Sequence, residues 1–320
     1  MKTKLCLVVP CFNESAILVD TINVLQNKLD MLIKDSLITP DSFLFLVNDG
    51  SSDTTWEIIK AAHARNPRQV KGASLSANCG HQAALLAGLI KAKDMADAVI
   101  SLDADLQDDI DILPDFVREF HKGNDIVYGV RSDRSSDSFF KRFTAEGFYK
   151  IMQWLGVKSI YNHADFRLLS KRAIEALCEY REVNLYIRGI IPLLGFHQSI
   201  VLYTRKKAER PTHYPIHKML MLAWNGITSF SVKPIRLITA FGFSVFSLGI
   251  LYCIYALIGK FQGNTVAGWT SIILLLMFLG GIQLISIGVI GEYIAKTYIE
   301  VKDRPRFHIQ ETTESIDKNS

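Results

Sequence analysis

Acidic and amide side chains follow an apolar run in residues 99–109, VISLDADLQDD, in a pattern that suits metal binding. Asp103, Asp105 and Gln107 alternate with two apolar residues at the end of this run. On an extended backbone, a period of two directs all three polar side chains to one side. Carboxylate and amide oxygens suit Mg²⁺ or Mn²⁺, hard ions that bridge protein carboxylates to phosphates. The stretch therefore predicts a metal and ligand site at the carboxyl end of a buried strand.

Two other interpretations of this stretch are available. A solvated, inert acidic loop after a strand would have the same composition. An EF-hand fits worse, because its sixth position, which needs Gly, is Asp108, and its twelfth, which needs Glu, is Pro114. The other motifs of the chain favour the functional interpretation.

Short β-forming runs alternate with helical segments over the first 130 residues. The expected strands are 4–12, 43–47, 73–75, 98–102 and 126–130. Four helices are expected: one that ends near residue 32, one that begins near residue 54, and two that span 82–93 and 114–122. We expect Pro10 to break the first strand, and Asn13, Glu14 and Ser15 to cap the helix after it. The alternation predicts an α/β fold, a mostly parallel sheet with helices on both faces.

The polar ends of two strands are expected to meet. Asp49 ends the second expected strand as Asp103 ends a later one, so in a parallel sheet both lie at one edge, beside the loop 10–14. A nucleotide fits there, with carboxylates and amides for its ribose and base and a metal for its diphosphate. The chain has neither a Walker loop nor a GxGxxG motif, so NTPase and dinucleotide-binding functions lose support.

The C-terminal third is apolar and explains the positive mean hydropathy of +0.17. Residues 237–258 and 269–290 contain no charged side chain, and each run exceeds the ~20 residues that cross a bilayer. Two spans, about 235–258 and 269–292, are expected. The basic residues on their outer flanks are Lys233, Arg236, Lys296, Lys302, Arg304 and Arg306. The positive-inside rule then predicts a multi-pass protein of the cell membrane with both termini in the cytosol.

Four motifs, in this order along the chain, resemble those of family 2 glycosyltransferases of GT-A type: VVPCFNE, VNDGSSD, LDADLQD and HADFRLLSKRA. The two apolar C-terminal helices resemble the polyisoprenyl-phosphate branch of that family, which includes bactoprenol glucosyltransferases and, more distantly, dolichol-phosphate mannose synthases. The likeness covers residues 4–305. It implies a GT-A fold, a homotetramer, and Mg²⁺ or Mn²⁺ as cofactor.

The resemblance also implies roles for residues of the donor side. Those implied to bind the nucleotide are Pro10, Asn13, Glu14, Asp49 and Asp103. Asp103 and Asp105 match the DxD pair, and Gln107 matches a glutamine that helps to hold the metal. We expect Asp105, Arg131 and Asp165 to carry catalysis.

Basic residues are expected to meet the acceptor phosphate or the diphosphate. They are Arg131, Arg134, Lys141, Arg142, Arg167, Arg188, Arg205, Lys207 and Arg210. The segment GVRSDRSSDSFFKR matches the family pattern closely, with a solvated basic helix as the alternative. Arg167 could pair with Asp165 or reach the diphosphate.

Asp165 lies where the family places a carboxylate near the sugar. It could act as a general base. However, a lipid phosphate with a second pKa of ~6 is already largely dianionic at neutral pH. We therefore expect Asp165 to orient a sugar hydroxyl, with the base role as the second option. His163 is expected to serve local structure.

Four segments are expected: a cytosolic glycosyltransferase domain (1–214), an interfacial amphipathic helix (215–232), the transmembrane hairpin (233–298) and a cytosolic tail (299–320) that is disordered after His308. A buried core helix is the alternative for 215–232. The five cysteines form no CxxC pair, so reduced thiols and no zinc site are expected.

The predicted function is inverting transfer of a hexose from a nucleotide sugar, UDP-glucose or UDP-N-acetylglucosamine, to undecaprenyl phosphate. Donors such as GDP-mannose or a UDP-modified arabinose are alternatives. A processive polysaccharide synthase is disfavoured because the chain has no QxxRW sequence and too few spans. A non-catalytic lipid-binding partner or flippase component would not need the acidic set around Asp105. The mild net charge of +4 by itself argues neither for nor against nucleic acid, and nucleic acid is not expected as a partner.

Overall fold

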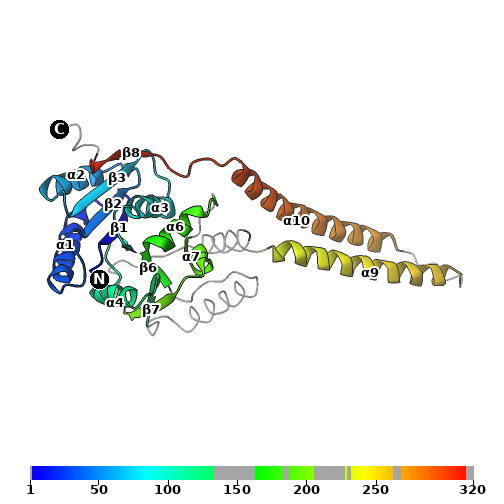
Figure 1. Cartoon of the computed structure of the whole chain (residues 1–320). Coiled ribbons are helices and arrows are strands. Elements are labelled where there is room, and N and C mark those ends of the chain that lie inside the picture. Colours follow the sequence, from blue (N-terminus) through cyan, green and yellow to red (C-terminus); the bar gives the residue numbers. More distant parts are fainter. Residues whose placement is uncertain are drawn as a thin grey trace. The chain divides into compact units, whose positions relative to one another are not determined.

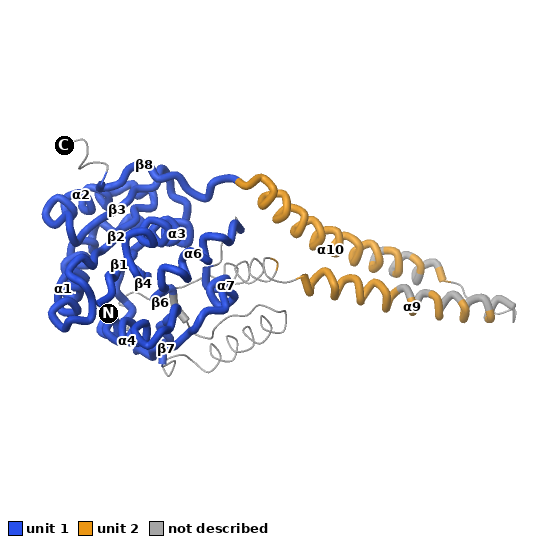
Figure 2. Tube along the Cα trace, viewed as in Figure 1, with its two compact units in different colours: residues 1–147, 158–213, 304–320 blue, residues 148–157, 214–303 orange. Residues whose placement is uncertain are grey.

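The computed structural model describes residues 2–132, 163–182, 187–204, 228, 232–261 and 268–314. The chain divides into two units (Figure 2). The first comprises residues 1–147, 158–213 and 304–320, and the second comprises 148–157 and 214–303. Of the expected tail, 299–320, residues 304–320 are thus assigned to the first unit and 299–303 to the second.

The first unit is built on one eight-stranded sheet with the order β7-β5-β6-β4-β1-β2-β3-β8. The strands are β1 (Leu5–Cys11), β2 (Phe43–Asn48), β3 (Val70–Leu75), β4 (Ala98–Ser101), β5 (Ile126–Arg131), β6 (His163–Ser170), β7 (Gln198–Tyr203) and β8 (Ile309–Thr312). The pairs β1–β2, β1–β4, β2–β3 and β5–β7 are parallel. β6 runs antiparallel to β4 and β5, and β8 runs antiparallel to β3. The expected mostly parallel α/β sheet is confirmed.

Helices cover both faces of this sheet (Figure 1). They are α1 (Leu18–Lys34), α2 (Thr55–Arg65), α3 (His81–Ala92), η1 (Ile110–Ile112), α4 (Leu113–His121), α6 (Lys171–Glu179), α7 (Ile187–Ile190) and η2 (Ile191–Leu194). In β1, Leu5, Leu7 and Val9 join a core cluster with α1, α2 and α4. Val8 points to the opposite face, where a Cβ on Gly88 of α3 would lie 2.4 Å from a Val8 methyl carbon. This close approach fixes α3 against the centre of the sheet.

The start of the chain differs from the sequence expectation in two ways. β1 continues through Pro10 to Cys11, because its pairing with β4 ends at Val8 and Pro10 has a strand on one side only. The helix begins at Leu18, and its N-cap, Ile17, makes no side-chain capping bond. The expected cap by Asn13, Glu14 and Ser15 is therefore wrong.

The expected disorder after His308 is wrong for residues 309–314. β8 covers the edge of β3, which would otherwise present unpaired backbone groups. The Trp56 indole donates to Glu311 Oε2 at 2.8 Å, and the Gly72 N–H donates to Thr313 Oγ1 at 3.1 Å. Residues 309–312 thus form a strand of the sheet, although their polar composition does not predict one.

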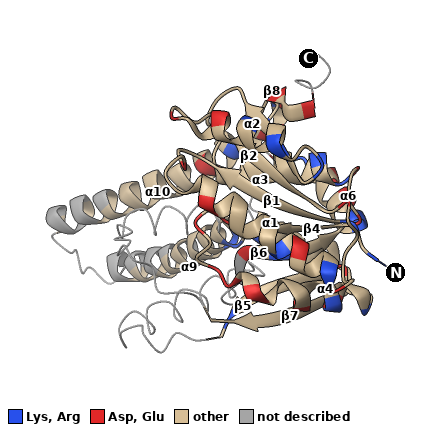
Figure 3. Cartoon of the chain, turned by 90° about the vertical axis from the view of Figure 1, so that its left-hand side faces the viewer, with Lys and Arg blue, Asp and Glu red and all other residues tan. Residues whose placement is uncertain are grey.

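The second unit contains two long helices, α9 (Lys233–Phe261, 29 residues) and α10 (Trp269–Val301, 33 residues), which run side by side (Figure 2). Among the described residues, one helical stretch, Phe278–Val301, is long and apolar enough to cross a membrane. Most of the charged residues coloured in Figure 3 belong to the sheet unit, whereas the described parts of α9 and α10 contain few of them. The expected interfacial helix 215–232 lies almost entirely outside the described residues.

Candidate active site

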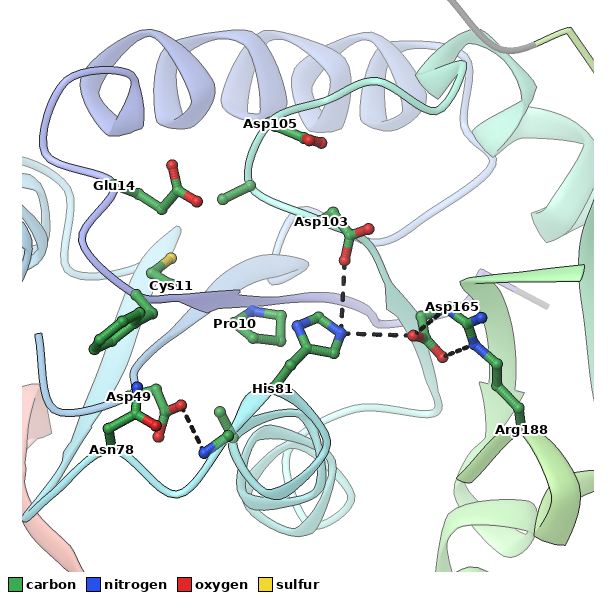
Figure 4. Close-up of a pocket in the computed structure, with 14 residues that line it drawn as sticks. Pro10, Cys11, Glu14, Asp49, Asn78, His81, Asp103, Asp105, Asp165 and Arg188 are labelled. Carbon is green, nitrogen blue, oxygen red and sulfur yellow. Dashed lines mark hydrogen bonds and ion pairs between the residues drawn. The ribbon is translucent and has the colours of Figure 1, made fainter. Parts of the chain in front are cut away.

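A pocket of about 410 Å³ lies where β1, β2 and β4 end. The residues that line it are Pro10, Cys11, Phe12, Glu14, Asp49, Asn78, Gly80, His81, Ala84, Asp103, Ala104, Asp105, Asp165 and Arg188 (Figure 4). These residues come from loops at the carboxyl edge of the parallel strands, and from β6 and α7. The edge that the sequence predicts for ligand binding is therefore the edge at which the pocket forms.

The predicted site residues divide into three groups. Those that line the pocket are Pro10, Glu14, Asp49, Asp103, Asp105, Asp165 and Arg188. Those that the structure places outside its lining are Asn13, Gln107, Arg131 and Arg167. Those that lie outside the described residues are Arg134, Lys141, Arg142, Arg205, Lys207 and Arg210.

The acidic loop after β4 is not extended. β4 ends at Ser101, so the period of two expected for the polar side chains does not continue to Gln107. Leu106 has a φ of 46°, a left-handed conformation that non-glycine residues rarely adopt. The backbone N–H of Gln107 donates to Asp105 Oδ1 at 3.2 Å. This turn brings Asp103 and Asp105 to the pocket and leaves Gln107 out of its lining.

Asn13 ties two loops together instead of facing the pocket. Its Oδ1 accepts a hydrogen bond at 2.9 Å from the backbone N–H of Ser52, which lies in the loop after β2. Asp53 in that loop accepts from the backbone N–H groups of Ser15 and Thr55, each at 3.0 Å. Although burial raises the pKa of Asp53, these bonds and the side-chain bonds of Thr55 outweigh it and lower the pKa to about 2. The VNDGSSD motif thus organises the pocket rim.

Asp49 holds the loop that precedes α3. Its Oδ1 accepts from the Cys79 N–H at 2.8 Å and its Oδ2 from the Gly80 N–H at 3.0 Å. Burial raises the pKa of Asp49, and these two bonds oppose the rise. The same loop packs so closely on Gly50, with φ of 62°, that a Cβ there would lie 2.4 Å from the Ala77 carbonyl carbon. Glycine is required at this position.

Asp165 is the centre of a buried ion-pair network on β6. Arg188 donates to it from Nε to Oδ1 at 3.0 Å and from NH2 to Oδ2 at 2.7 Å. The buried Arg167 forms a second ion pair with the same carboxylate. Gln82 of α3 donates to Oδ2 at 3.2 Å. Burial alone would raise the pKa of Asp165, but Arg167, His81 and Arg188 hold it well below its usual range. The carboxylate is therefore a stable anion.

Arg167 is fully buried, with 1% of its side chain exposed. Of the two roles that the sequence left open, the structure contains the pairing with Asp165. An arginine at this depth serves as the permanent counter-charge of a buried carboxylate. It does not present its guanidinium to the pocket.

Sequence reasoning did not single out His81, the first residue of α3. Its Nε2 lies 3.6 Å from Asp103 Oδ1 and 3.6 Å from Asp165 Oδ2 (Figure 4). The interaction with Asp165 raises the pKa of His81. Burial lowers this pKa, and the charge of Asp103 raises it further. The available signal was that His81 follows the third parallel strand, β3, after a short loop, and therefore lies at the same sheet edge as Asp49 and Asp103.

Arg131 and Asp108 form a separate cluster with Tyr203. The Tyr203 hydroxyl donates to Asp108 Oδ1 at 2.6 Å, and Arg131 NH2 donates to the same oxygen at 3.3 Å. Arg131 Nε also donates to the Tyr203 hydroxyl at 3.3 Å. Arg131 thus occupies the end of β5 as a partner of Asp108, outside the pocket lining.

The pocket carries more negative than positive charge. Its acidic residues are Glu14, Asp49, Asp103, Asp105 and Asp165. Burial and the carboxylates of Asp165 and Asp105 raise the pKa of Asp103, and His81 opposes them. In the described residues, no three His, Cys, Asp or Glu side chains gather closely enough to hold a metal ion without adjustment. The all-oxygen donor set and the mutual repulsion of its carboxylates nevertheless fit a hard divalent cation.

Comparison with known proteins gives this pocket a family context. Residues 6–178, which contain all the strands at the pocket edge, match the model described as glycosyl transferase family 2. The chain belongs to glycosyltransferase family 2. As a member of that family it is a glycosyltransferase, and its residues 233–297 match the model described as the GtrB C-terminal hairpin.

Relatives of this glycosyltransferase extend over nearly its whole length. An uncharacterized glycosyltransferase of Bacillus subtilis, YkoT, is 53% identical over 306 residues, which cover 95% of this chain and 90% of that protein. The SfII prophage-derived bactoprenol glucosyl transferase of Shigella flexneri is 39% identical over 317 residues, 97% of this chain and 98% of that protein. A prophage bactoprenol glucosyl transferase homolog of Escherichia coli is 39% identical over 312 residues, with 96% and 98% coverage.

Proposed function

We propose that this glycosyltransferase moves a hexose from a nucleotide sugar to a polyprenyl phosphate, with inversion at the anomeric carbon. UDP-glucose or UDP-N-acetylglucosamine is the proposed donor, and undecaprenyl phosphate is the proposed acceptor. The observation that carries this proposal is the acidic pocket, which has Arg188 as the one arginine among its lining residues. The bactoprenol glucosyl transferase relatives support the choice of acceptor.

Mg²⁺ or Mn²⁺ is the cofactor that we propose for the acidic end of the pocket. Asp103 and Asp105 would hold the ion, with Gln107 as the further ligand that the family resemblance implies. When bound, such an ion neutralises the charge of the nucleotide diphosphate, which five pocket carboxylates would otherwise repel. Pro10, Glu14 and Asp49 border the neighbouring part of the pocket, where we propose that the nucleoside binds.

The proposed reaction is a single displacement. An oxygen of the acceptor phosphate attacks the anomeric carbon from the face opposite the diphosphate. The new C–O bond forms as the bond to the diphosphate breaks, and the bonding electron pair leaves with the nucleoside diphosphate. An α-linked donor would thus give a β-linked product. Because a lipid phosphate with a second pKa of ~6 is largely dianionic at neutral pH, no base is required.

We propose that Asp165 orients groups of the site and does not accept a proton. Its two oxygens accept bonds from Arg188 and Gln82, and Arg167 neutralises it from the buried side. A carboxylate whose pKa is held well below its usual range is a weak base. Arg188, with 40% of its side chain exposed, is the better candidate to touch the acceptor phosphate.

We further propose that the α9–α10 hairpin anchors the catalytic domain in the cell membrane, with both chain termini in the cytosol. The basic residues around the hairpin and the match of residues 233–297 to the GtrB C-terminal hairpin support this arrangement. A membrane-impermeant thiol reagent tests it on Gly263→Cys and Ser320→Cys, each in a Cys79→Ser background. In intact cells, only the Gly263→Cys variant should be labelled. The proposed homotetramer is tested by light scattering of the detergent-solubilised protein.

The transfer reaction is tested with purified protein in detergent, Mg²⁺ or Mn²⁺, undecaprenyl phosphate and a panel of labelled UDP- and GDP-sugars. We expect label from one donor to enter the organic phase. Asp105→Asn should abolish transfer, whereas Asp111→Asn, which alters a carboxylate of the same loop that pairs with Lys28, should not. Folded protein that transfers no label from any donor would contradict the proposal.

A further inference from the structure

His81 connects two parts of the pocket that the proposed reaction uses separately. Asp103 follows β4 on the donor side, and Asp165 lies on β6, where it binds Arg188. The Nε2 atom of His81 is 3.6 Å from one oxygen of each carboxylate (Figure 4). A single ring nitrogen therefore stands between the proposed metal ligand and the proposed partner of the acceptor phosphate.

Contacts of the neighbouring residues fix the backbone position of His81. His81 follows Gly80, whose φ of 89° favours glycine and whose N–H is bonded to Asp49. The next residue, Gln82, donates to Asp165. α3 itself is held against the sheet at Gly88. The backbone of His81 is thus held by contacts of the residues before and after it.

The geometry leaves the Nε2–H group shared between its two acceptors. Both distances are longer than the 2.7–3.2 Å of an ordinary N–H···O hydrogen bond. One hydrogen cannot bond well to two carboxylates at once, so any group that binds one of them releases the hydrogen to the other. A cation at Asp103 would do this, because it would occupy the lone pairs that His81 faces.

We propose that His81 is a positioning residue that links donor binding to the acceptor side of the site. When the donor and its cation occupy Asp103, the Nε2–H of His81 bonds to Asp165, and Asp165 then holds Arg188 in the geometry that meets the acceptor phosphate. The inference rests on the proposed function. It adds a residue that no sequence motif had marked, and a route of four side chains, Asp103, His81, Asp165 and Arg188, from one substrate to the other.

Four substitutions test this role. His81→Gln keeps an N–H donor near the position of Nε2, His81→Asn ends its amide about one atom short, His81→Leu keeps the volume without a donor, and His81→Ala removes both. We expect kcat to fall about 10- to 100-fold in the Ala, Leu and Asn variants, and markedly less in the Gln variant. The KM for the nucleotide sugar should change less than about threefold, whereas the KM for the polyprenyl phosphate should rise.

Two further measurements separate positioning from packing. Binding of UDP with Mn²⁺, measured by calorimetry without turnover, should be nearly unchanged in all four variants. Added imidazole should restore part of the transfer activity of His81→Ala, because the pocket is open to small molecules. His121→Gln serves as the control, since His121 contacts Thr3 outside the pocket.

The outcomes are distinct. Wild-type activity in His81→Leu, or a loss of UDP binding equal to the loss of kcat, would overturn the inference and leave the proposed function in place. Absence of transfer by the wild-type protein with every donor would overturn the proposed function itself. Recovery by Gln and imidazole, with no recovery by Asn or Leu, would support the link through Nε2.

Discussion

Arg188 grips Asp165 with two nitrogens, Nε at 3.0 Å from Oδ1 and NH2 at 2.7 Å from Oδ2. This bidentate pair joins α7 to β6, and both of its residues line the pocket. Since 40% of the Arg188 side chain remains exposed, the arginine can bind Asp165 and still meet a phosphate. Asp165 is thus the buried member of the pair, which holds Arg188 in place, and Arg188 is the exposed member, which presents a positive charge to the pocket.

Arg188→Ala should lower kcat for sugar transfer by about 100-fold, the usual cost of removing one group that stabilises transition-state charge. Arg188→Lys should recover only part of this loss, because a lysine cannot hold the carboxylate with two nitrogens in one plane. Transfer assays at saturating nucleotide sugar measure both. Arg172→Ala is the matched control, since Arg172 binds the carboxylate of Asp125 away from the pocket. Equal losses in Arg188→Ala and Arg172→Ala would point to general destabilisation instead.

Proton transfer to Asp165 should make no contribution to the rate. Arg167, His81 and Arg188 hold the pKa of this carboxyl well below its usual range against the effect of burial, so it stays ionised between pH 5 and 8. We therefore expect kcat measured in D2O to be about equal to kcat in H2O, because no proton moves in the displacement. A solvent isotope effect of about two or more, lost in Asp165→Asn, would show that Asp165 acts as a base.

The strands at the pocket edge could be predicted because each is a short apolar run that ends in a polar motif. Phe43–Asn48 followed by Asp49 is an example, and the parallel arrangement brings Asp49 to the edge where Asp103 also lies. Local sequence contains this information, since the run, its length and the residue that ends it are contiguous.

The missed features depend on contacts between distant segments. Residues 309–312 have too few apolar side chains to suggest a strand, yet they pair with β3 because that edge is open. His81 lies near two carboxylates from distant segments, Asp103 in the loop after β4 and Asp165 on β6, and its place after β3 is the one signal of this along the chain. Gln107 lies outside the pocket lining for a local reason, because the left-handed Leu106 ends the alternation from which its position was predicted.

Asp53 should stabilise the domain in a pH-dependent way. Its pKa is about 2 in the folded protein, below the ordinary value of 3.8, so its contribution is present above pH 4 and is lost as the pH falls towards 2. Because Asp53 is partly exposed, we expect Asp53→Asn to lower the free energy of unfolding by only about 1 kcal/mol at pH 7. Thermal unfolding at pH 7 and at pH 3 should show a smaller wild-type advantage at pH 3. Asp41→Asn, on an exposed turn, should show no such difference; a pH-independent effect of Asp53→Asn would contradict the assignment.

The strand β8 should support the pocket, because His308, just before it, contacts the loop that Asp49 holds. The N–H of Ser76, at the start of that loop, donates to the carbonyl of His308 at 2.9 Å, and Glu311 accepts from the indole of Trp56. Deletion of residues 308–320 would release Ser76 and expose the edge of β3. We expect the affinity for UDP with Mn²⁺ to fall about tenfold, which corresponds to about 1.4 kcal/mol.

Deletion of residues 315–320 is the control for this experiment, since it leaves β8 and its contacts intact. If the longer deletion impairs folding, Glu311→Gln provides a milder test, because it replaces a charged acceptor of the Trp56 hydrogen bond by a neutral one and should weaken UDP binding by less than the deletion. Calorimetry measures the affinities, and circular dichroism confirms that each variant is folded. Wild-type UDP affinity in a folded protein that lacks residues 308–320 would show that β8 serves only to cover the sheet edge.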